Sequence, residues 1–335
     1  MKQSSPQHML KYGIGATHML DSLWFQEKIE SVSVKSDHGR ACSLGELTDE
    51  EKEQCAVVDP SWEELPVIMT TLRRLSTHIF LFDIDKDTEI TIRGTGAATI
   101  FVRVREGVSV KIRERILSQA VQIRIIVSLK SHAAVQYITL PRAAGSTTMA
   151  LRQAFIGNDS SVTFCGAETA GADLVSQYIS YLRGAGAQSH QYIVFTARDK
   201  QIRDIYTAVH HEAARTCSSI ATRGVQRDQS VSFYRGQVVM APAVSGASGH
   251  QQARMLLLSP GARAHAVPDL RVAHNNVSCS HAVGISHIDD TKTFYLESRG
   301  VSALIAREML IRAHLQEIMD HFPADLQQCV MTSLV

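Results

Sequence analysis

The sequence has little that would place it in a membrane, in an oxidising compartment or on a nucleic acid. No apolar run approaches the roughly 18 residues that span a bilayer. The opening MKQSSPQHMLKYG lacks the apolar centre of a signal peptide. The six cysteines are scattered with no CxxC pair, which suits free thiols better than a disulfide framework. A net charge of +1 and 6% aromatic residues argue against attraction to nucleic acid or anionic lipid. We therefore expect a cytoplasmic protein with no nucleic-acid partner and no membrane partner.

The motifs of common catalytic centres are missing as well. No GxSxG, HExxH or Walker A sequence occurs. Glycine-rich stretches at 94–99 and 184–187 lack the lysine and the long following helix of a phosphate cradle, so they are interpreted as turns. A polysaccharide-cleaving enzyme needs clustered carboxylates and aromatic platforms, and both are sparse in this sequence. The sequence thus predicts a scaffold with no catalytic residues of its own rather than an enzyme.

What is present is a long succession of β-branched, alternating runs. They begin near residue 78, start every 10–15 residues or so, and are separated by turn residues. No helix of crossover length lies between them, which excludes a doubly wound α/β sheet. An antiparallel sandwich and a β-solenoid both remain open, and the unbroken succession favours the solenoid. The expected strands are 89–92, 98–104, 108–112, 121–129, 134–140, 147–155, 161–167, 174–182, 191–197, 230–240, 253–259, 269–273 and 277–280.

The two ends have a different pattern. Residues 1–76 are polar and helix-leaning, with a helix expected to begin at Thr48 and another short helical piece at 61–75. Residues 77–288 would form the β core. Residues 289–335 return to helical periodicity, with Ser302 as the expected N-cap of a long helix that ends before Pro323. One apolar face is expected for this helix, made of Leu304, Ile305, Ile311, Leu315, Ile318, Met319 and Phe322.

Histidines and cysteines gather near the end of the β zone, in VAHNNVSCSHAVGISHID. Cys279 and His281 are two residues apart, so on a strand their side chains point to the same face. A thiolate and an imidazole are good ligands for iron or zinc, yet two ligands make only half a site. A buried thiol beside a surface histidine is the simpler interpretation of the spacing alone. His210 and His211 would point to opposite faces, so at most one of them joins a given site.

The second half of the sequence resembles the SufB/SufD family of iron–sulfur cluster assembly proteins, over about residues 200–320. The matching stretches follow the family's order: DIYTAVHHEAARTCSS (204–219), FYRGQVVMAPAV (233–244), GHQQARMLLLSPGARAHAVPDLRVAHNNVSCSHAVGISHID (249–289) and FYLESRGVSALIAREMLIRAHLQEIMD (294–320). The resemblance implies a right-handed parallel β-helix flanked by N- and C-terminal helical segments. It also implies a complex in which two paralogous β-helices pair and an ABC-type ATPase subunit docks on the C-terminal helices.

Between the two paralogues, the sequence is more similar to SufD. SufB-like chains carry a cysteine where this chain has Ala262, and Glu-His-Glu where it has Ser280-His281-Ala282. The CSH triplet at 279–281 follows the SufD pattern. Ala282 replaces a glycine of the family pattern, so the turn expected after His281 should differ, because glycine tolerates positive φ and alanine does not. Met255 stands where an asparagine is usual.

The resemblance assigns roles to particular residues. It implies metal or sulfur handling at His281, Cys279 and His265, around an iron–sulfur cluster held transiently at the subunit interface. It implies a SufB-like paralogue and a SufC-like ABC-type ATPase as partners, and leaves open a flavin in the complex. A self-paired homodimer and a β-helix enzyme acting on polysaccharide are the alternatives. The residues expected to bind a partner are Phe294, Tyr295, Arg299, Gly300, Leu310 and Leu315.

Overall fold

The structure is a computed structural model of the 335-residue chain. It describes residues 33–35, 39–42, 47–56, 79–94, 96–117, 120–142, 145–169 and 171–332. Among these residues, no helix combines the length and the hydrophobicity that crossing a bilayer requires. The helical piece expected at 61–75 lies outside the described residues.

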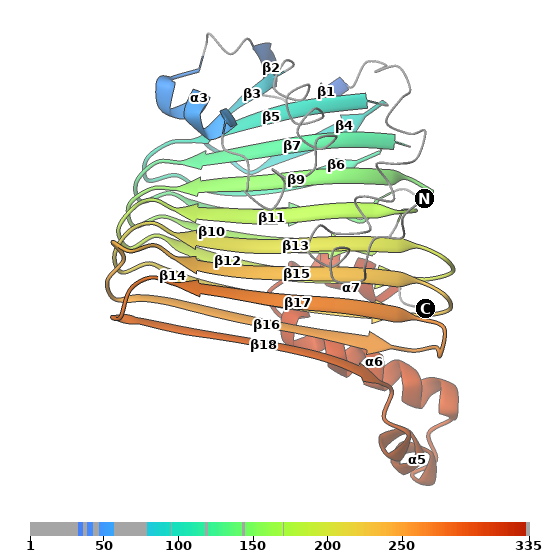
Figure 1. The fold of residues 1–335 in the computed structure, drawn as a ribbon. Coiled ribbons are helices and arrows are strands. Elements are labelled where there is room, and N and C mark those ends of the chain that lie inside the picture. The colour runs from blue at the N-terminus through green and yellow to red at the C-terminus, as the bar shows by residue number, and fades with distance from the viewer. Residues whose placement is uncertain are drawn as a thin grey trace, which may run out of the picture.

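Two nine-stranded sheets, here called sheet A and sheet B, lie one behind the other (Figure 1). In spatial order, sheet A contains β1 (Ser33–Lys35), β4 (Thr88–Arg93), β6 (Ser109–Ile116), β8 (Ala134–Thr139), β10 (Ser161–Glu168), β12 (Gln188–Ala197), β14 (Cys217–Gln226), β16 (Ala247–Leu257) and β18 (Val277–His287). Sheet B contains β2 (Gly39–Cys42), β3 (Ile79–Ile84), β5 (Gly96–Val104), β7 (Ala120–Leu129), β9 (Thr147–Ile156), β11 (Leu174–Leu182), β13 (Ile202–His211), β15 (Val231–Met240) and β17 (Arg263–Val272).

From β3 onward the chain alternates between the sheets, and each strand pairs in parallel with the strand two places later. β10, for example, pairs in parallel with both β8 and β12. This is a β-solenoid, or β-helix, as the sequence predicts, and not an antiparallel sandwich. Because the pairing is in register, alternate residues of every strand stack in rows that point between the sheets. These inner rows form the main hydrophobic core.

The inner rows also hold a charged cluster. Arg152 is fully buried; its Nε donates to Oε2 of Glu114 at 2.7 Å, and its Nη1 lies 3.5 Å from Oε1 of Glu168. Arg142 forms a second ion pair with Glu168, and the Tyr178 hydroxyl donates to Glu168 Oε1 at 2.6 Å. Burying a charge is costly unless it is paired and hydrogen-bonded. The cluster therefore specifies how β6, β9, β10 and β11 stack.

At the N-terminal end the described chain is less helical than expected. β1 and β2, which the sequence did not predict, pair antiparallel with β4 and β3. The helix expected from Thr48 is α3 (Asp49–Ala56). The Thr48 hydroxyl accepts from the Glu51 amide, and Glu51 Oε2 accepts from the Thr48 amide at 2.8 Å, which is a capping box.

Three helices follow the solenoid: α5 (Asp290–Ser298), α6 (Ala303–Met319) and α7 (Ala324–Thr332). α6 packs on the outer face of sheet A, where Leu315, Ile318 and Met319 are fully buried. Leu304 and Ile305, which the sequence places on the same apolar face, do not share this packing, because they are 79% and 51% exposed. The first half of α6 projects beyond the edge of sheet A (Figure 1), which agrees with the exposure of these two residues.

Candidate functional site

Among the residues that the structure describes, no further strand covers the C-terminal end of the solenoid, which we call the open end. β17 and β18 are the last strands of their sheets, so their inner rows have a neighbouring coil on one side only. Inner-row residues at this end keep considerable exposure, with Val272 at 48% and Ile285 at 45%. Exposed apolar rows and an unpaired strand edge are features that proteins usually cover, so this end is suited to contact with another chain.

Cys279 and His281 lie in the inner row of β18, on the same side of the strand as the sequence predicts. In register, Cys279 pairs with Gly249 and His281 with Gln251, and both partners are buried inner-row residues of β16. Cys279 is half-buried against the core, whereas His281 is exposed. The strand continues to His287, so the turn expected after His281 is absent and Ala282 is an ordinary strand residue.

The Cys279 thiol is protonated in this environment. Burial raises its pKa above the ordinary value, and a backbone hydrogen bond at Gly249 offsets part of that rise. Cysteine binds a metal ion as the thiolate, so a metal ion bound by Cys279 would have to replace the thiol proton. The site would therefore bind a soft metal more strongly as the pH rises.

His265, the third expected ligand, lies elsewhere. It is on β17, where Ala264 and Ala266 pack on the inner core, so the His265 ring points to the outer face of sheet B. There it stacks on Phe233, with 5.0 Å between ring centroids. The structure brings Cys279 and His281 onto one row and leaves His265 apart from them. The separation arises because Ala264 and Ala266 occupy the inner row of β17, which turns the residue between them to the outer face.

Two ligands do not complete a metal site. Among the described residues, no group of three or more His, Cys, Asp or Glu side chains is arranged to hold a metal ion. The pair at Cys279 and His281 lies at the last strand of sheet A, and the described part of the chain does not complete a ligand set around it.

The adjacent histidines on β13 point to opposite faces, as expected. His211 is fully buried in the inner row, with Nδ1 2.7 Å from Thr216 Oγ1 and Nε2 2.8 Å from Ser218 Oγ. His210 points outward and stacks on Tyr181 at 4.8 Å. Both ring nitrogens of His211 are occupied, so this residue has a structural role.

A second exposed surface lies on α5 and the first half of α6. No residue of α5 is buried, and Phe294 and Tyr295 are 71% and 57% exposed. Arg299 lies over the Tyr295 ring at 5.4 Å, and Gly300 follows with φ +86, a conformation that suits a helix end. Three further apolar residues on α6 are exposed: Leu304 and Ile305, which the sequence places on the apolar face without predicting their exposure, and Met309, which the sequence interpretation missed. We name the set of Phe294, Tyr295, Leu304, Ile305 and Met309 the helical patch.

The other two residues expected to bind a partner differ from each other. Leu310 is half-buried, whereas Leu315 is fully buried against Ile138, Cys165 and Val194 of sheet A. Leu315 is therefore not accessible to a partner in this structure. A leucine's position along a helix does not reveal where the sheet beneath it ends, so the sequence could not separate the two.

The sequence of this core is similar to that of known proteins. The family model of the SufBD core domain, described as SUF system FeS cluster assembly, matches residues 90–314, more than half of the chain. The iron–sulfur cluster assembly protein SufD of Bacillus subtilis is 27% identical over 184 residues, which cover 55% of this chain and 42% of that protein.

Two further relatives carry only the broader family name. A SufBD family protein of Synechocystis is 28% identical over 170 residues, 50% of this chain and 35% of its own length. One of Staphylococcus epidermidis is 23% identical over 238 residues, 70% of this chain and 50% of its own length. The match thus spans half or less of each of these relatives. Together with the parallel β-solenoid, the family match shows that the chain belongs to the SufBD family of the SUF iron–sulfur cluster assembly system.

Proposed function

We propose that this chain is a SufD-like scaffold subunit that pairs with a SufB-like paralogue and a SufC-like ABC-type ATPase during iron–sulfur cluster assembly. The observation that carries the proposal is the open end of the solenoid, where Cys279 and His281 share one inner row with no neighbouring coil beyond them. Half a ligand set on an uncovered strand edge is what a site shared between two chains requires. Cys165, Cys217, Cys279 and Cys329 form no disulfide within the described chain, which supports a reducing compartment, the cytoplasm.

In this proposal the paralogue covers β17 and β18. Its strands would pair with the free edge of β18 and bury the apolar residues Val272 and Ile285. Iron and sulfide are the cargo of the complex, and this chain would contribute ligand atoms that bind them. Neutral His281 would donate a ring-nitrogen lone pair, and Cys279 would contribute its sulfur after losing the thiol proton. The paralogue would supply the remaining ligands, and no residue of this chain is assigned to a flavin.

The ATPase would dock on the helical patch, with Arg299 and Gly300 shaping its rim and Leu310 at its edge. Its closure on ATP would then pull on α6, whose second half packs on sheet A. The buried guanidinium of Arg223 links α6 to sheet A. Arg223, on β14, donates from Nη2 to Glu317 Oε2 of α6 at 2.5 Å and to Gln252 Oε1 of β16 at 2.7 Å. β16 is the neighbour of β18, so movement of α6 would reach the strand that carries Cys279 and His281.

Anaerobic co-purification of the tagged chain from its native host tests the proposal. We expect a SufB-like chain and an ATPase to co-elute in a fixed ratio with iron. His281→Ala should lower cluster formation by the assembled complex by about tenfold or more, the cost of a lost ligand or close ligand support. His132→Asn is the control, because His132 is an exposed histidine on the turn between β7 and β8, and asparagine tolerates its positive φ. If the chain elutes alone and free of metal, the scaffold proposal fails. If the complex forms and His281→Ala makes clusters normally, only the ligand role fails.

The open end also permits a self-paired homodimer as a second candidate. Each copy would present the same uncovered β17 and β18. The alanine at position 262, where SufB-like chains carry a cysteine, favours the mixed pair. Co-elution of differently tagged copies of this chain, without a paralogue, would support the homodimer.

A further inference from the structure

A pocket of about 240 Å³ lies between α6 and the outer face of β16 and β18. It is lined by residues of all three elements, among them Gln252 and Arg254 of β16, Gly284 and Ser286 of β18, and His314 of α6. β18 is the last described strand of sheet A, so the pocket adjoins the strand edge at the open end. The proposed function uses the edge and the inner row of β18, and it gives this outer-face pocket no role.

Arg254 is the only charged side chain among the described residues that line this pocket. It is exposed on the outer face of β16, because its neighbours Ala253 and Met255 lie in the inner core. Within the described chain, no hydrogen bond or ion pair engages the Arg254 guanidinium. The carboxylate of Glu317, on α6, is paired with Arg223 at 2.5 Å. Arg254 therefore brings to the pocket a positive charge that has no counter-charge among the described residues.

His314 adds no charge to the pocket at neutral pH. Burial, followed by the nearby charge of Arg223, lowers the pKa of His314 to about 4. Backbone hydrogen bonds at Gly224 and Arg254 offset part of this shift and hold the ring against β14 and β16. The imidazole is therefore a neutral part of the pocket wall.

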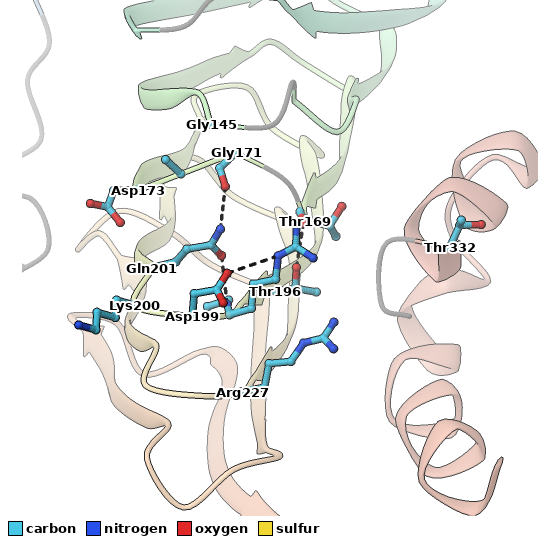
Figure 2. A pocket seen from close by; sticks show the side chains of 13 residues that line it. Gly145, Thr169, Gly171, Asp173, Thr196, Asp199, Lys200, Gln201, Arg227 and Thr332 are labelled. Carbon is cyan, nitrogen blue, oxygen red and sulfur yellow. Dashed lines mark hydrogen bonds and ion pairs between the residues drawn. The ribbon is translucent and has the colours of Figure 1, made fainter. Parts of the chain in front are cut away.

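A larger pocket, of about 510 Å³, shows the contrast. It lies beside the turns that follow β10 and β12 (Figure 2). Apart from Arg227, which has a partner of its own, its charged lining residues are two cations, Arg198 and Lys200, and two anions, Asp173 and Asp199. These four charges balance, so that pocket has no excess charge to offer a partner, whereas the pocket beside β18 has.

Gly284 leaves a gap between Arg254 and the edge of sheet A. In register, Arg254 of β16 pairs with Gly284 of β18. A Cβ added at Gly284 would meet no atom within 4 Å, so the space over this residue is open. Neighbouring strands of a sheet lie about 4.8 Å apart, so a strand added to β18 would place its residue opposite Gly284 about 10 Å from Arg254. An arginine and an acidic side chain can meet across that distance when only a glycine lies between them.

A second copy of β18 would not supply the missing carboxylate. The sequence of the strand, VSCSHAVGISH, contains no acidic residue. Asp289 and Asp290 follow the strand, but they begin α5, and Asp289 Oδ1 already accepts from the Thr291 and Lys292 amides. The charge of Arg254 therefore fits an added strand of different sequence better than a second copy of this one.

We propose that Arg254 pairs with a carboxylate side chain on the strand of the SufB-like paralogue that adds to β18, across the gap over Gly284. This inference rests on the proposed function, and it specifies the charge that the paralogue must carry at this position. A guanidinium and a carboxylate form two parallel, charge-assisted hydrogen bonds, which fix geometry as well as affinity. Gln252 and Ser286, in the same pocket, offer further hydrogen-bond donors to the same carboxylate. The pair would thus set the register of the added strand against β18.

The affinity of the full chain for the purified SufB-like chain, measured by fluorescence anisotropy, tests this proposal. Arg254→Ala should raise the Kd about tenfold or more at low salt. As the salt concentration rises from about 0.1 M to about 1 M, the wild type should lose more affinity than Arg254→Ala does, because salt screens the charge pair. Arg254→Glu should raise the Kd further, since it brings two carboxylates together. Arg198→Ala is the matched control, because Arg198 is an exposed arginine beside the balanced pocket, on the turn after β12. It should change neither the Kd nor its salt dependence.

Gly284→Val tests the gap itself. Valine suits a strand and the open space over residue 284 accommodates it, so the isolated variant should keep the wild-type melting temperature. Its side chain would stand between Arg254 and the added strand, so pairing should weaken and its salt dependence should approach that of Arg254→Ala.

The outcomes separate this inference from the proposed function. A wild-type chain that does not bind the SufB-like chain would overturn both. If the wild type binds, and Arg254→Ala binds with the same Kd and the same salt dependence, only this inference is overturned. Unchanged pairing of Gly284→Val would overturn it as well.

Discussion

Some buried residues of this solenoid are charged, and their charges are stable in the core only because oppositely charged groups lie beside them. Glu168 is fully buried between Arg142 and Arg152. Burial by itself would raise the pKa of Glu168, but the two guanidinium groups and the hydroxyls of Ser176 and Tyr178 outweigh it and hold the pKa at about 2. The carboxylate is therefore ionised across the physiological range, and the fold depends on its charge.

Glu168→Gln should destabilise the protein by about 3–5 kcal/mol at pH 7, because it leaves buried guanidinium charge without a counter-charge. The folded-state pKa lies below the ordinary 4.5, so this stabilisation is complete above pH 4.5 and is lost as the pH falls toward 2. Urea unfolding measured at several pH values checks both statements. Glu106→Gln, on an exposed turn, is the control and should change neither stability nor its pH dependence. An acid-sensitivity profile unchanged by Glu168→Gln would contradict the argument.

His211 predicts a second pH dependence, in a milder range. Burial, with a smaller effect of neighbouring His210, lowers the pKa of His211 to about 4. The contribution of neutral His211 to the free energy of unfolding is complete above the ordinary pKa of 6.5. It falls as the pH drops from 6.5 to 4, because over this range His211 takes up a proton in the unfolded chain but not in the folded one. The loss should reach about 2 kcal/mol at pH 5. In His211→Gln the free energy of unfolding should vary less between pH 7.5 and 5 than it does in the wild type. Parallel curves for His211→Gln and the wild type would refute the assignment.

At the level of single residues, the sequence predicts which side chains of one strand share a face, and it does not predict which face of the strand meets the core. The shared face of Cys279 and His281 and the opposite faces of His210 and His211 follow from the two-residue period. The position of His265 on an outer face does not follow, because it depends on which residues of β17 face the core.

At the level of elements, α6 divides into a packed half and a projecting half. Leu315, Ile318 and Met319 rest on sheet A, while Leu304, Ile305 and Met309 extend past it. Helical periodicity locates an apolar face, but the length of that face that meets a sheet depends on the width of the solenoid. The helix and its N-cap position at Ser302 were therefore predictable, whereas the exposed half was not.

Substitutions in the two halves should separate stability from partner binding. Leu315→Ala should cost about 2–5 kcal/mol, as for other buried leucines, by urea unfolding. Leu304→Glu should change the free energy of unfolding by less than about 0.5 kcal/mol, because the side chain is 79% exposed. Leu304→Glu should nevertheless abolish co-elution of the ATPase. Normal ATPase binding by this variant would remove the helical patch from the proposed interface.

At the level of the whole molecule, the two ends of the solenoid are unequal. α3 and the short antiparallel strands β1 and β2 lie at the N-terminal end, whereas β17 and β18 leave the C-terminal end uncovered. The solenoid itself was predictable, because thirteen runs with a two-residue period and no crossover helices leave few other folds. The antiparallel β1 and β2 were not, since three and four residues are too short to show a period.

Hydrogen–deuterium exchange checks the open end. In the isolated chain the amides of β18 should exchange faster than those of β12, which has a neighbouring strand on each side. Adding the SufB-like partner should slow exchange across β18 by about tenfold or more and leave β12 unchanged. Equal rates at β18 with and without the partner would place the interface elsewhere.

The inequality of the two ends has a consequence for assembly. A parallel solenoid with two uncovered ends could add copies without limit, as the strands of a fibril do. Here the strands at one end reverse direction and are only three and four residues long, which makes that end a poor template for a further strand. Contact through the other end uses the long edge of β18. In the proposed pairing, union of two such chains through this edge would therefore end the growth of the solenoid in a discrete pair.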